Sequence, residues 1–297
     1  MTHWRLTMRR VGRALRRMLE RKMSVSASHQ YTTPSRPRPT FRRALEVNVR
    51  VIGALLMRNG TMRYGHENLG FFWVIGEPLV LTVGVMGMWT VSGQTHGHGI
   101  GVVPFALSGY SMITLWRHLS GHSVHAIRNN MGLLFHRNVT IIDVLVAGSL
   151  LEIIGILTAF FVAWTPLALL GVVDPMQDPV LFLCGYLLQG WFGTAFGLLV
   201  AALSELYEAT EQVLPPLLYI TLPFTGIFSM AGWLPQSWRE VIAWSPLATN
   251  IEMLRAGMFA GDINYYYYPT YVVGWCVALT AISLPLVQYA RRTVSFT

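Results

Sequence analysis

Runs of apolar residues alternate with short polar links along the chain from about residue 65 onward. A helix needs about 20 predominantly apolar residues to cross a bilayer, and several runs approach or exceed that length. The pattern therefore predicts an all-α membrane protein with six transmembrane helices. The predicted spans are residues 69–92, 100–116, 141–170, 180–203, 213–231 and 265–289. The fifth is expected to be interrupted by Pro215, Pro216 and Pro223.

The link between the second and third predicted spans is cationic. Residues 117–143 contain Arg117, Arg128 and Arg137 with several histidines, and no acid precedes Asp143. A link rich in Arg is expected on the cytoplasmic side. Its middle part favours either a short amphipathic helix that docks on a soluble partner or a solvated connector. The apolar residues at helical spacing are Val124, Ile127, Met131 and Leu134.

The other links agree with this orientation. The link after the first span and the link that carries Asp174 and Asp178 contain no Arg or Lys, so both are expected outside. Counting spans places the acidic link with Glu205, Glu208 and Glu211 inside, and Arg291 and Arg292 end the last span. Both termini are therefore expected in the cytoplasm.

Residues 41–64 predict an amphipathic helix before the first span. Apolar residues recur three or four positions apart, but interspersed arginines and Glu46 make the segment too charged to cross a membrane. Such a helix is expected to lie in the membrane interface. The apolar positions are Phe41, Leu45, Val49, Ile52 and Leu56.

Residues 233–261 are amphipathic and contain Pro235 and Pro246. The segment predicts two short helices that enter the outer leaflet and return. Irregular backbone at that depth requires cover by protein or a water-filled cavity.

Composition supports a membrane protein. The chain is 53% hydrophobic and 12% charged, whereas a soluble domain carries about 25% charged residues. Residues 1–40 form a basic arm with a Pro- and Ser-rich linker. This arm is expected to be disordered, to lie on anionic lipid, to act as a transit peptide, or to precede a true start at Met23. Residues 65–297 form the predicted membrane domain. The basic charge is attributed to topology, so no nucleic-acid partner is expected.

Motifs for catalysis are absent from the sequence. Lys22 is the only lysine and lies outside any Gly-Lys-Ser/Thr motif, so this polypeptide has no Walker-type ATP site. Cys184 and Cys276 are isolated, and the histidines are interpreted as solvated loop residues. The sequence therefore predicts no metal, no cofactor in this chain and no enzymatic activity, and favours transport or scaffolding.

Two acids lie inside apolar runs, Glu77 and Glu152. A carboxylate in lipid must pair, protonate or face water. We expect a structural pair or an interfacial contact. The alternative is a proton relay in a secondary carrier.

Several motifs together resemble the permease subunit of bacterial capsular-polysaccharide ABC exporters of the ABC-2 type. They include Arg63-Tyr64-Gly65, the run 69–73 followed by Glu77-Pro78-Leu79, and Leu150-Leu151-Glu152. Further matches are Asn130 with Leu133 and Leu134, and Pro246-Leu247 followed by Glu252 and Arg255. The sequence departs from the pattern at Gly148, where an arginine is expected, and at Ser245, where an asparagine is common.

The resemblance implies a homodimer in the bacterial inner membrane that moves a lipid-linked, acidic polysaccharide. A separate ATPase subunit would bind ATP and Mg²⁺ and dock on residues 117–140, and periplasmic co-polymerase and outer-membrane export proteins are possible partners. O-antigen, teichoic-acid or small-molecule permeases remain alternatives within this class. The implied coupling residues are Val124, Ile127, Arg128, Asn129, Asn130, Met131, Leu133 and Leu134.

The resemblance also suggests substrate contacts. The helix 41–64 would be a gate helix whose arginines attract the anionic lipid linker, namely Arg50, Arg58 and Arg63. Aromatic side chains near the outer surface suit sugar rings but are equally typical of membrane interfaces. The candidates are Trp233, Trp238, Trp244, Tyr265, Tyr266, Tyr267 and Tyr268.

Overall fold

The computed structural model of the protein describes residues 41–64, 80, 84, 100–135, 139–259 and 264–294. Within these ranges every regular element is an α-helix or a 3-10 helix, which confirms the predicted all-α fold there. The chain divides into two units, Met1–Leu45 and Glu46–Thr297. Only the start of helix α2 (Phe41–Tyr64) is described in the first unit, so the architecture below is that of the second.

Three described helices are long and apolar enough to cross a membrane: α6 (Ile141–Leu169), α7 (Pro179–Leu206) and α11 (Pro269–Val294). They correspond to the third, fourth and sixth predicted spans. The ends of α6 and α7 lie close to the predicted ends. In contrast, α11 begins at Pro269, so the four tyrosines predicted to start this span precede the helix instead.

The remaining predicted spans differ in outcome. Helix α4 (Val102–Gly121) covers the second span and continues past its predicted end. The fifth predicted span, residues 213–231, is interrupted as expected, although the break comes at Pro223 and not at Pro215 or Pro216. Helix α8 (Ala209–Thr221) is followed by the 3-10 helix η3 (Leu222–Thr225), because Pro223 lacks an N–H and Gly226 adopts a left-handed conformation with φ 74°. The first span, apart from residues 80 and 84, lies outside the described residues.

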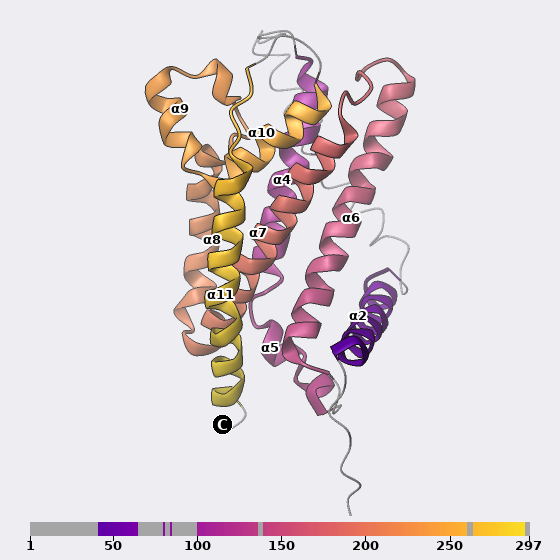
Figure 1. Ribbon diagram of the computed structural model, residues 1–297, viewed down its shortest axis with the longest axis vertical. Coiled ribbons are helices and arrows are strands. Elements are labelled where there is room, and N and C mark those ends of the chain that lie inside the picture. The colour runs from indigo at the N-terminus through magenta and orange to yellow at the C-terminus, as the bar shows by residue number, and fades with distance from the viewer. Residues whose placement is uncertain are drawn as a thin grey trace, which may run out of the picture. The chain divides into compact units, whose positions relative to one another are not determined.

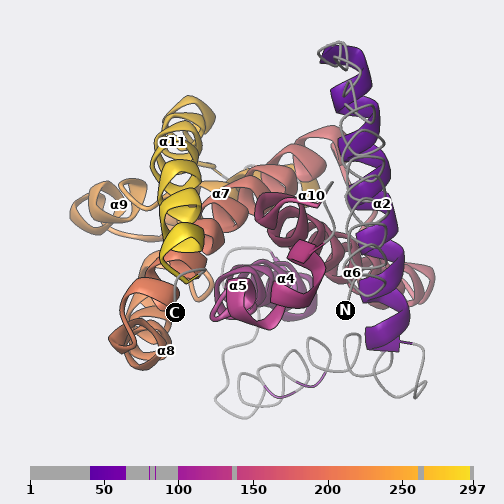
Figure 2. The same cartoon turned by 90° about the horizontal axis from the view of Figure 1, so that it is seen from below.

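Helix α7 lies at the centre of the bundle, against α4 and α11 (Figures 1 and 2). Its glycines allow this close packing. A Cβ atom added at Gly193 would lie 2.6 Å from Leu119 Cδ1 of α4, and one at Gly197 would lie 2.6 Å from the Leu119 carbonyl oxygen. Gly193 and Gly197 thus form a face of close helix approach, with α4 of the same chain as the neighbour.

Two helices occupy the amphipathic segment before the last span, α9 (Gln236–Ala243) and α10 (Pro246–Met258). The sequence predicted two helices in this segment, and the structure has two. The depth to which they enter a membrane stays a prediction. They differ in environment. Helix α10 is almost entirely buried and packs on α7, whereas α9 exposes Trp238.

Arg255 of α10 joins several elements from a fully buried position. Its guanidinium donates to the carbonyl oxygens of Gly226 (2.7 Å) and Ile227 (3.2 Å) and lies 3.8 Å from the ring centroid of Phe105 in α4. Glu252, one turn earlier, accepts a hydrogen bond from the Ala231 N–H (2.8 Å). Because the buried guanidinium of Arg255 is hydrogen-bonded to these carbonyl oxygens, it fixes the segment after η3 onto α4 and α10.

Candidate functional site

The cationic link is two short helical pieces, rather than one amphipathic helix. Because α4 extends to Gly121, the link starts later than predicted, and a turn leads into α5 (Ala126–Asn129). His125 adopts the left-handed conformation in that turn, with φ 53°. The 3-10 helix η2 (Met131–Phe135) follows, and α6 then begins behind a capping box of Thr140 and Asp143.

The apolar residues of the link face the protein's own core. Ile127 is 1% exposed and clusters with Ile141 of α6 and Leu198 of α7. Val124 and Leu133 are half-buried against other core clusters. Ile127 therefore packs within the bundle in this structure and not on an exposed face, because the apolar spacing that suits a partner groove also suits the bundle. The side chain of Leu134 lies outside the described residues.

Two polar residues of the link, Arg128 and Asn129, are exposed, whereas Asn130 and the apolar Met131 are half-buried. The Asn130 side-chain amide donates to the Ala126 carbonyl oxygen (2.9 Å) and so closes the end of α5. Arg128 and Asn129 are the predicted coupling residues that a partner can reach most directly.

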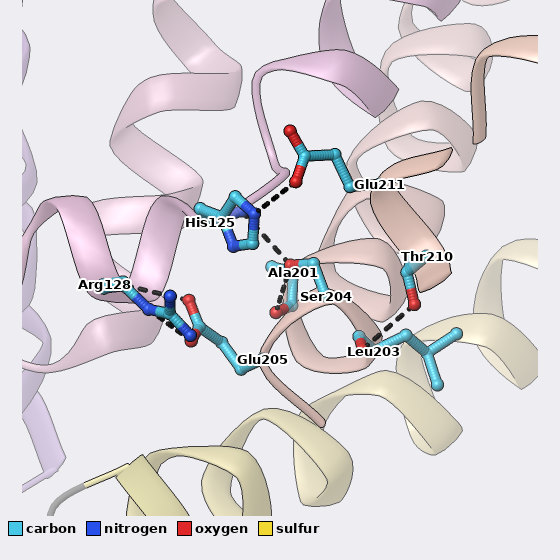
Figure 3. Close-up of polar contacts among 8 residues, drawn as sticks. All are labelled: His125, Arg128, Ala201, Leu203, Ser204, Glu205, Thr210 and Glu211. Carbon is cyan, nitrogen blue, oxygen red and sulfur yellow. Dashed lines mark hydrogen bonds and ion pairs between the residues drawn. The ribbon is translucent and has the colours of Figure 1, made fainter. Parts of the chain in front are cut away.

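The link is held by an acid near the end of α7, Glu205, and an acid in the first turn of α8, Glu211 (Figure 3). The Arg128 N–H donates to Glu205 Oε1 (3.0 Å), and Arg128 Nε lies 3.4 Å from Glu205 Oε2. The Glu205 side chain is buried, whereas the Arg128 side chain is 60% exposed, so the pair is open to solvent on the Arg128 side. His125 adds two contacts: its Nε2 lies 3.0 Å from Glu211 Oε2, and its N–H donates to Ser204 Oγ (3.2 Å).

Sequence reasoning did not identify these acidic partners. It placed the cationic link and the acidic link around residues 205–211 on the same side of the membrane, so opposite charge was the signal that could have paired them. The structure brings the two links together although they lie about eighty positions apart in sequence.

Glu152 has a histidine as its partner. His118 Nδ1 lies 3.0 Å from Glu152 Oε2, and the Glu152 side chain is 5% exposed. A pair or interfacial contact was predicted for Glu152, but His118 was predicted in a solvated loop. It lies in α4 because that helix continues past residue 116. Glu77, His96 and His98 lie outside the described residues, among which no group of three potential metal ligands occurs.

Of the three arginines predicted to attract an anion, the structure describes the side chains of Arg50 and Arg58. Arg50 is exposed on α2, and the Arg63 side chain lies outside the described residues. Arg58 is half-buried and lines a cavity of about 620 Å³ between α2, α4, α5 and α6.

The aromatic candidates divide into buried and exposed groups. Trp233 stacks on Phe105 with 5.2 Å between ring centroids, and the Tyr266 hydroxyl accepts from Arg239 Nη1 (3.0 Å), so both support the local fold. Tyr265 and Tyr267 are half-buried. The exposed candidates are Trp238, Trp244 and Tyr268.

Comparison with known proteins finds one matching family and several similar proteins. Residues 50–259 match the ABC-2 type transporter family. The chain is 33% identical over 255 residues to the capsule polysaccharide export inner-membrane protein CtrC of Neisseria meningitidis, covering 86% of this chain and 96% of that protein. It is 31% identical over 249 residues to the capsule polysaccharide export inner-membrane protein BexB of Haemophilus influenzae, covering 84% and 94%.

A more distant similarity extends to the polysialic acid transport protein KpsM of Escherichia coli, at 24% identity over 223 residues. This match covers 75% of the chain and 86% of that protein.

Proposed function

The chain belongs to the ABC-2 type transporter family, and from this premise we propose that it is the transmembrane subunit of a capsular-polysaccharide ABC exporter in the inner membrane. The names of the relatives supply the cargo class. A lipid-linked, acidic glycan is the proposed substrate, and a separate ATPase subunit is the proposed source of energy.

The observation that carries the coupling part of the proposal is the link at residues 122–135. It presents exposed Arg128 and Asn129 on one side, while buried Ile127 and the Arg128–Glu205 pair fasten it to the bundle on the other. A segment that is exposed outward and rigidly held inward is suited to receive force from a soluble subunit. We propose that the ATPase docks here, on residues 117–140.

Capture of the ATPase provides the test. Asn129→Glu places a charge and a longer side chain on the proposed contact, so we expect the tagged permease to capture its ATPase at least roughly tenfold more weakly and to lose glycan export. Ser237→Glu, on exposed positions of α9, is the matched control and is expected to leave capture unchanged. Equal capture by both variants would place the docking surface elsewhere.

The buried Glu152–His118 pair supports a second candidate, a proton-coupled carrier. The two readings differ in their energy source. In inverted vesicles that contain the permease and its ATPase, export that requires ATP and persists after the proton gradient is dissipated supports the exporter. Export on a proton gradient alone, abolished by Glu152→Gln, would support the carrier.

Assembly follows from the same proposal. We expect two copies of the chain around one translocation path, with periplasmic and outer-membrane export proteins receiving the glycan. Exposed Trp238, Trp244 and Tyr268 would meet either the glycan or the outer membrane interface.

A further inference from the structure

A cavity of ligand size lies between α9 and the beginning of α11. Its volume is about 480 Å³, within the range of roughly 300–1,000 Å³ typical of small-molecule sites. Figure 1 shows α9 at the opposite end of the bundle from α5. Three aromatic residues and one acid are among the residues that line the cavity, which are Glu240, Ala243, Trp244, Tyr268, Thr270 and Tyr271.

The charge of the cavity comes from Glu240. Its Oε1 accepts a hydrogen bond from the Gln236 side-chain amide (3.2 Å), and no cation forms an ion pair with it in the described ranges. The neighbouring guanidinium of Arg239 is engaged elsewhere, because it donates to the carbonyl oxygens of Ala231 (3.2 Å) and Leu234 (3.1 Å). The cavity therefore offers a carboxylate without a counter-ion to a cationic ligand.

Aromatic rings form much of the remaining lining. The Tyr271 hydroxyl donates to the Trp244 carbonyl oxygen (2.8 Å), which holds the end of α9 beside the first turn of α11. The side chains of Trp244 and Tyr268 are exposed, so a ligand can reach both rings. The face of an aromatic ring attracts cations, and rings of this kind recognise ammonium groups. Rings and a carboxylate around one cavity therefore favour an ammonium ligand.

The same charge disfavours an acidic glycan in this cavity. Aromatic rings also stack on sugars, and on that ground Trp244 and Tyr268 were candidates for contact with the cargo. Glu240, however, places a negative charge beside both rings, and like charges repel. The carboxylate thus distinguishes between the two ligand classes that the rings alone would accept.

An exposed apolar stripe of α11 continues from the cavity. Thr270, Val273 and Val277 follow one another at three and four positions, so they lie on the same face of the helix. Val273 and Val277 are exposed, and no described atom lies within 4 Å of a Cβ added at Gly274 beside them. An ammonium compound with apolar tails would find a surface for each of its parts here, and phospholipids with ethanolamine or choline headgroups are such compounds.

We propose that this cavity binds the ammonium group of a phospholipid headgroup. Glu240 is the counter-ion, the rings of Trp244, Tyr268 and Tyr271 form the cation–π surface, and the acyl chains lie along the α11 stripe at Val273 and Val277. An ethanolamine headgroup fits best, because its primary ammonium also donates charge-assisted hydrogen bonds to the carboxylate. The site involves neither the glycan nor the ATPase, so it is independent of the proposed function.

Calorimetric titration of the full chain in a neutral polyoxyethylene detergent tests the site. The probes are dihexanoylphosphatidylethanolamine, dihexanoylphosphatidylcholine and dihexanoylphosphatidylglycerol, of which the last has no ammonium group. We expect the two ammonium lipids to bind and phosphatidylglycerol to bind at least roughly tenfold more weakly. Similar affinities for all three lipids, or no binding of the two ammonium lipids, would overturn the proposal.

Substitutions assign the binding to this cavity. Glu240→Gln removes the charge but keeps an acceptor for the Gln236 amide, and is expected to weaken binding of phosphatidylethanolamine by roughly tenfold or more. Trp244→Leu is expected to weaken it by at least roughly threefold. The control is Glu208→Gln, which removes the same charge from an exposed position outside the cavity and should change affinity less than about twofold. Equal affinities of Glu240→Gln and Glu208→Gln would contradict the role of Glu240.

Two soluble probes identify the class of ligand. Phosphorylethanolamine has the headgroup without acyl chains, so we expect it to bind at least roughly tenfold more weakly than the lipid. Equal affinity for the two would overturn the assignment to a lipid. Trigalacturonate, an acidic trisaccharide, is expected not to displace phosphatidylethanolamine. Displacement that Trp244→Leu abolishes would assign the cavity to a glycan instead.

Discussion

At the scale of single residues, the buried charges show where sequence reasoning stops. Glu252 and Arg255 were recognised as part of a family pattern, but their spacing alone did not reveal that Arg255 donates to the carbonyl oxygens of Gly226 and Ile227. Those acceptors belong to an irregular turn, and hydropathy patterns carry no information about which carbonyl groups such a turn leaves unpaired. The partner of Glu152 was missed for a simpler reason, because the end of α4 was placed too early.

Replacing Arg255 is expected to destabilise the protein strongly. Arg255→Ala leaves the buried carbonyl oxygens of Gly226 and Ile227 without their donor, and leaving such a buried group unsatisfied costs about 1–3 kcal/mol. The free energy of unfolding, measured by titration with sodium dodecyl sulfate in mixed micelles, should fall by that amount. Arg291→Ala, at an exposed position of α11, should stay within about 0.5 kcal/mol. Similar values for the two variants would mean that the Arg255 network contributes little.

At the scale of elements, local signals explain what was predicted well. The start of α6 coincides with the predicted residue because Thr140 and Asp143 form a capping box, and Asp178 followed by Pro179 begins α7. The fifth predicted span is interrupted at Pro223 and Gly226, whereas Pro215 and Pro216 lie inside α8 without ending it. The prediction of one amphipathic helix in the link between α4 and α6 differs from the structure for another reason. Its helical spacing was real over part of its length, but spacing cannot distinguish burial against the chain itself from burial against a partner.

Two glycine substitutions test the helix packing with opposite expected signs. Gly197→Ala puts a Cβ atom 2.6 Å from the Leu119 carbonyl oxygen, and backbone cannot move aside as a side chain does, so we expect a loss of about 1–3 kcal/mol. At Gly274 of α11 no atom lies within 4 Å of the added Cβ in the described structure, so Gly274→Ala should be neutral or stabilise by up to about 1 kcal/mol.

Both variants can be measured as the free energy of unfolding in the same mixed micelles. An equal loss at the two positions would indicate that backbone freedom, rather than contact between α4 and α7, determines the effect. An unchanged Gly197→Ala variant would show that the two helices separate easily.

At the scale of the whole molecule, composition alone identified a helical membrane protein, and the ordered set of motifs identified the family. Residues 50–259 match that family, and the described helices include three that could cross a membrane. Orientation and assembly depend on the lipid bilayer and on other chains, so neither follows from contacts within one polypeptide. They stay predictions that labelling can decide.

Cysteine labelling in intact cells tests the orientation. In a background with Cys184→Ser and Cys276→Ser, Asn129→Cys should react with a membrane-impermeant maleimide only after the inner membrane is opened. Ser237→Cys on α9 should react when only the outer membrane is permeabilised. Reversal of this order would place residues 122–135 outside and remove the basis for an ATPase on that surface.

The attachment of Arg128 to Glu205 has a mechanical consequence. Because the anchor belongs to α7 and not to the helices that adjoin the link in sequence, displacement of α5 cannot be absorbed by bending of α4 or α6 alone. The central helix must shift with it, and the glycine contacts carry that shift to its neighbours. Movement that begins at the exposed surface of α5 would therefore reach α7, at the centre of the bundle, before it reaches the outer helices.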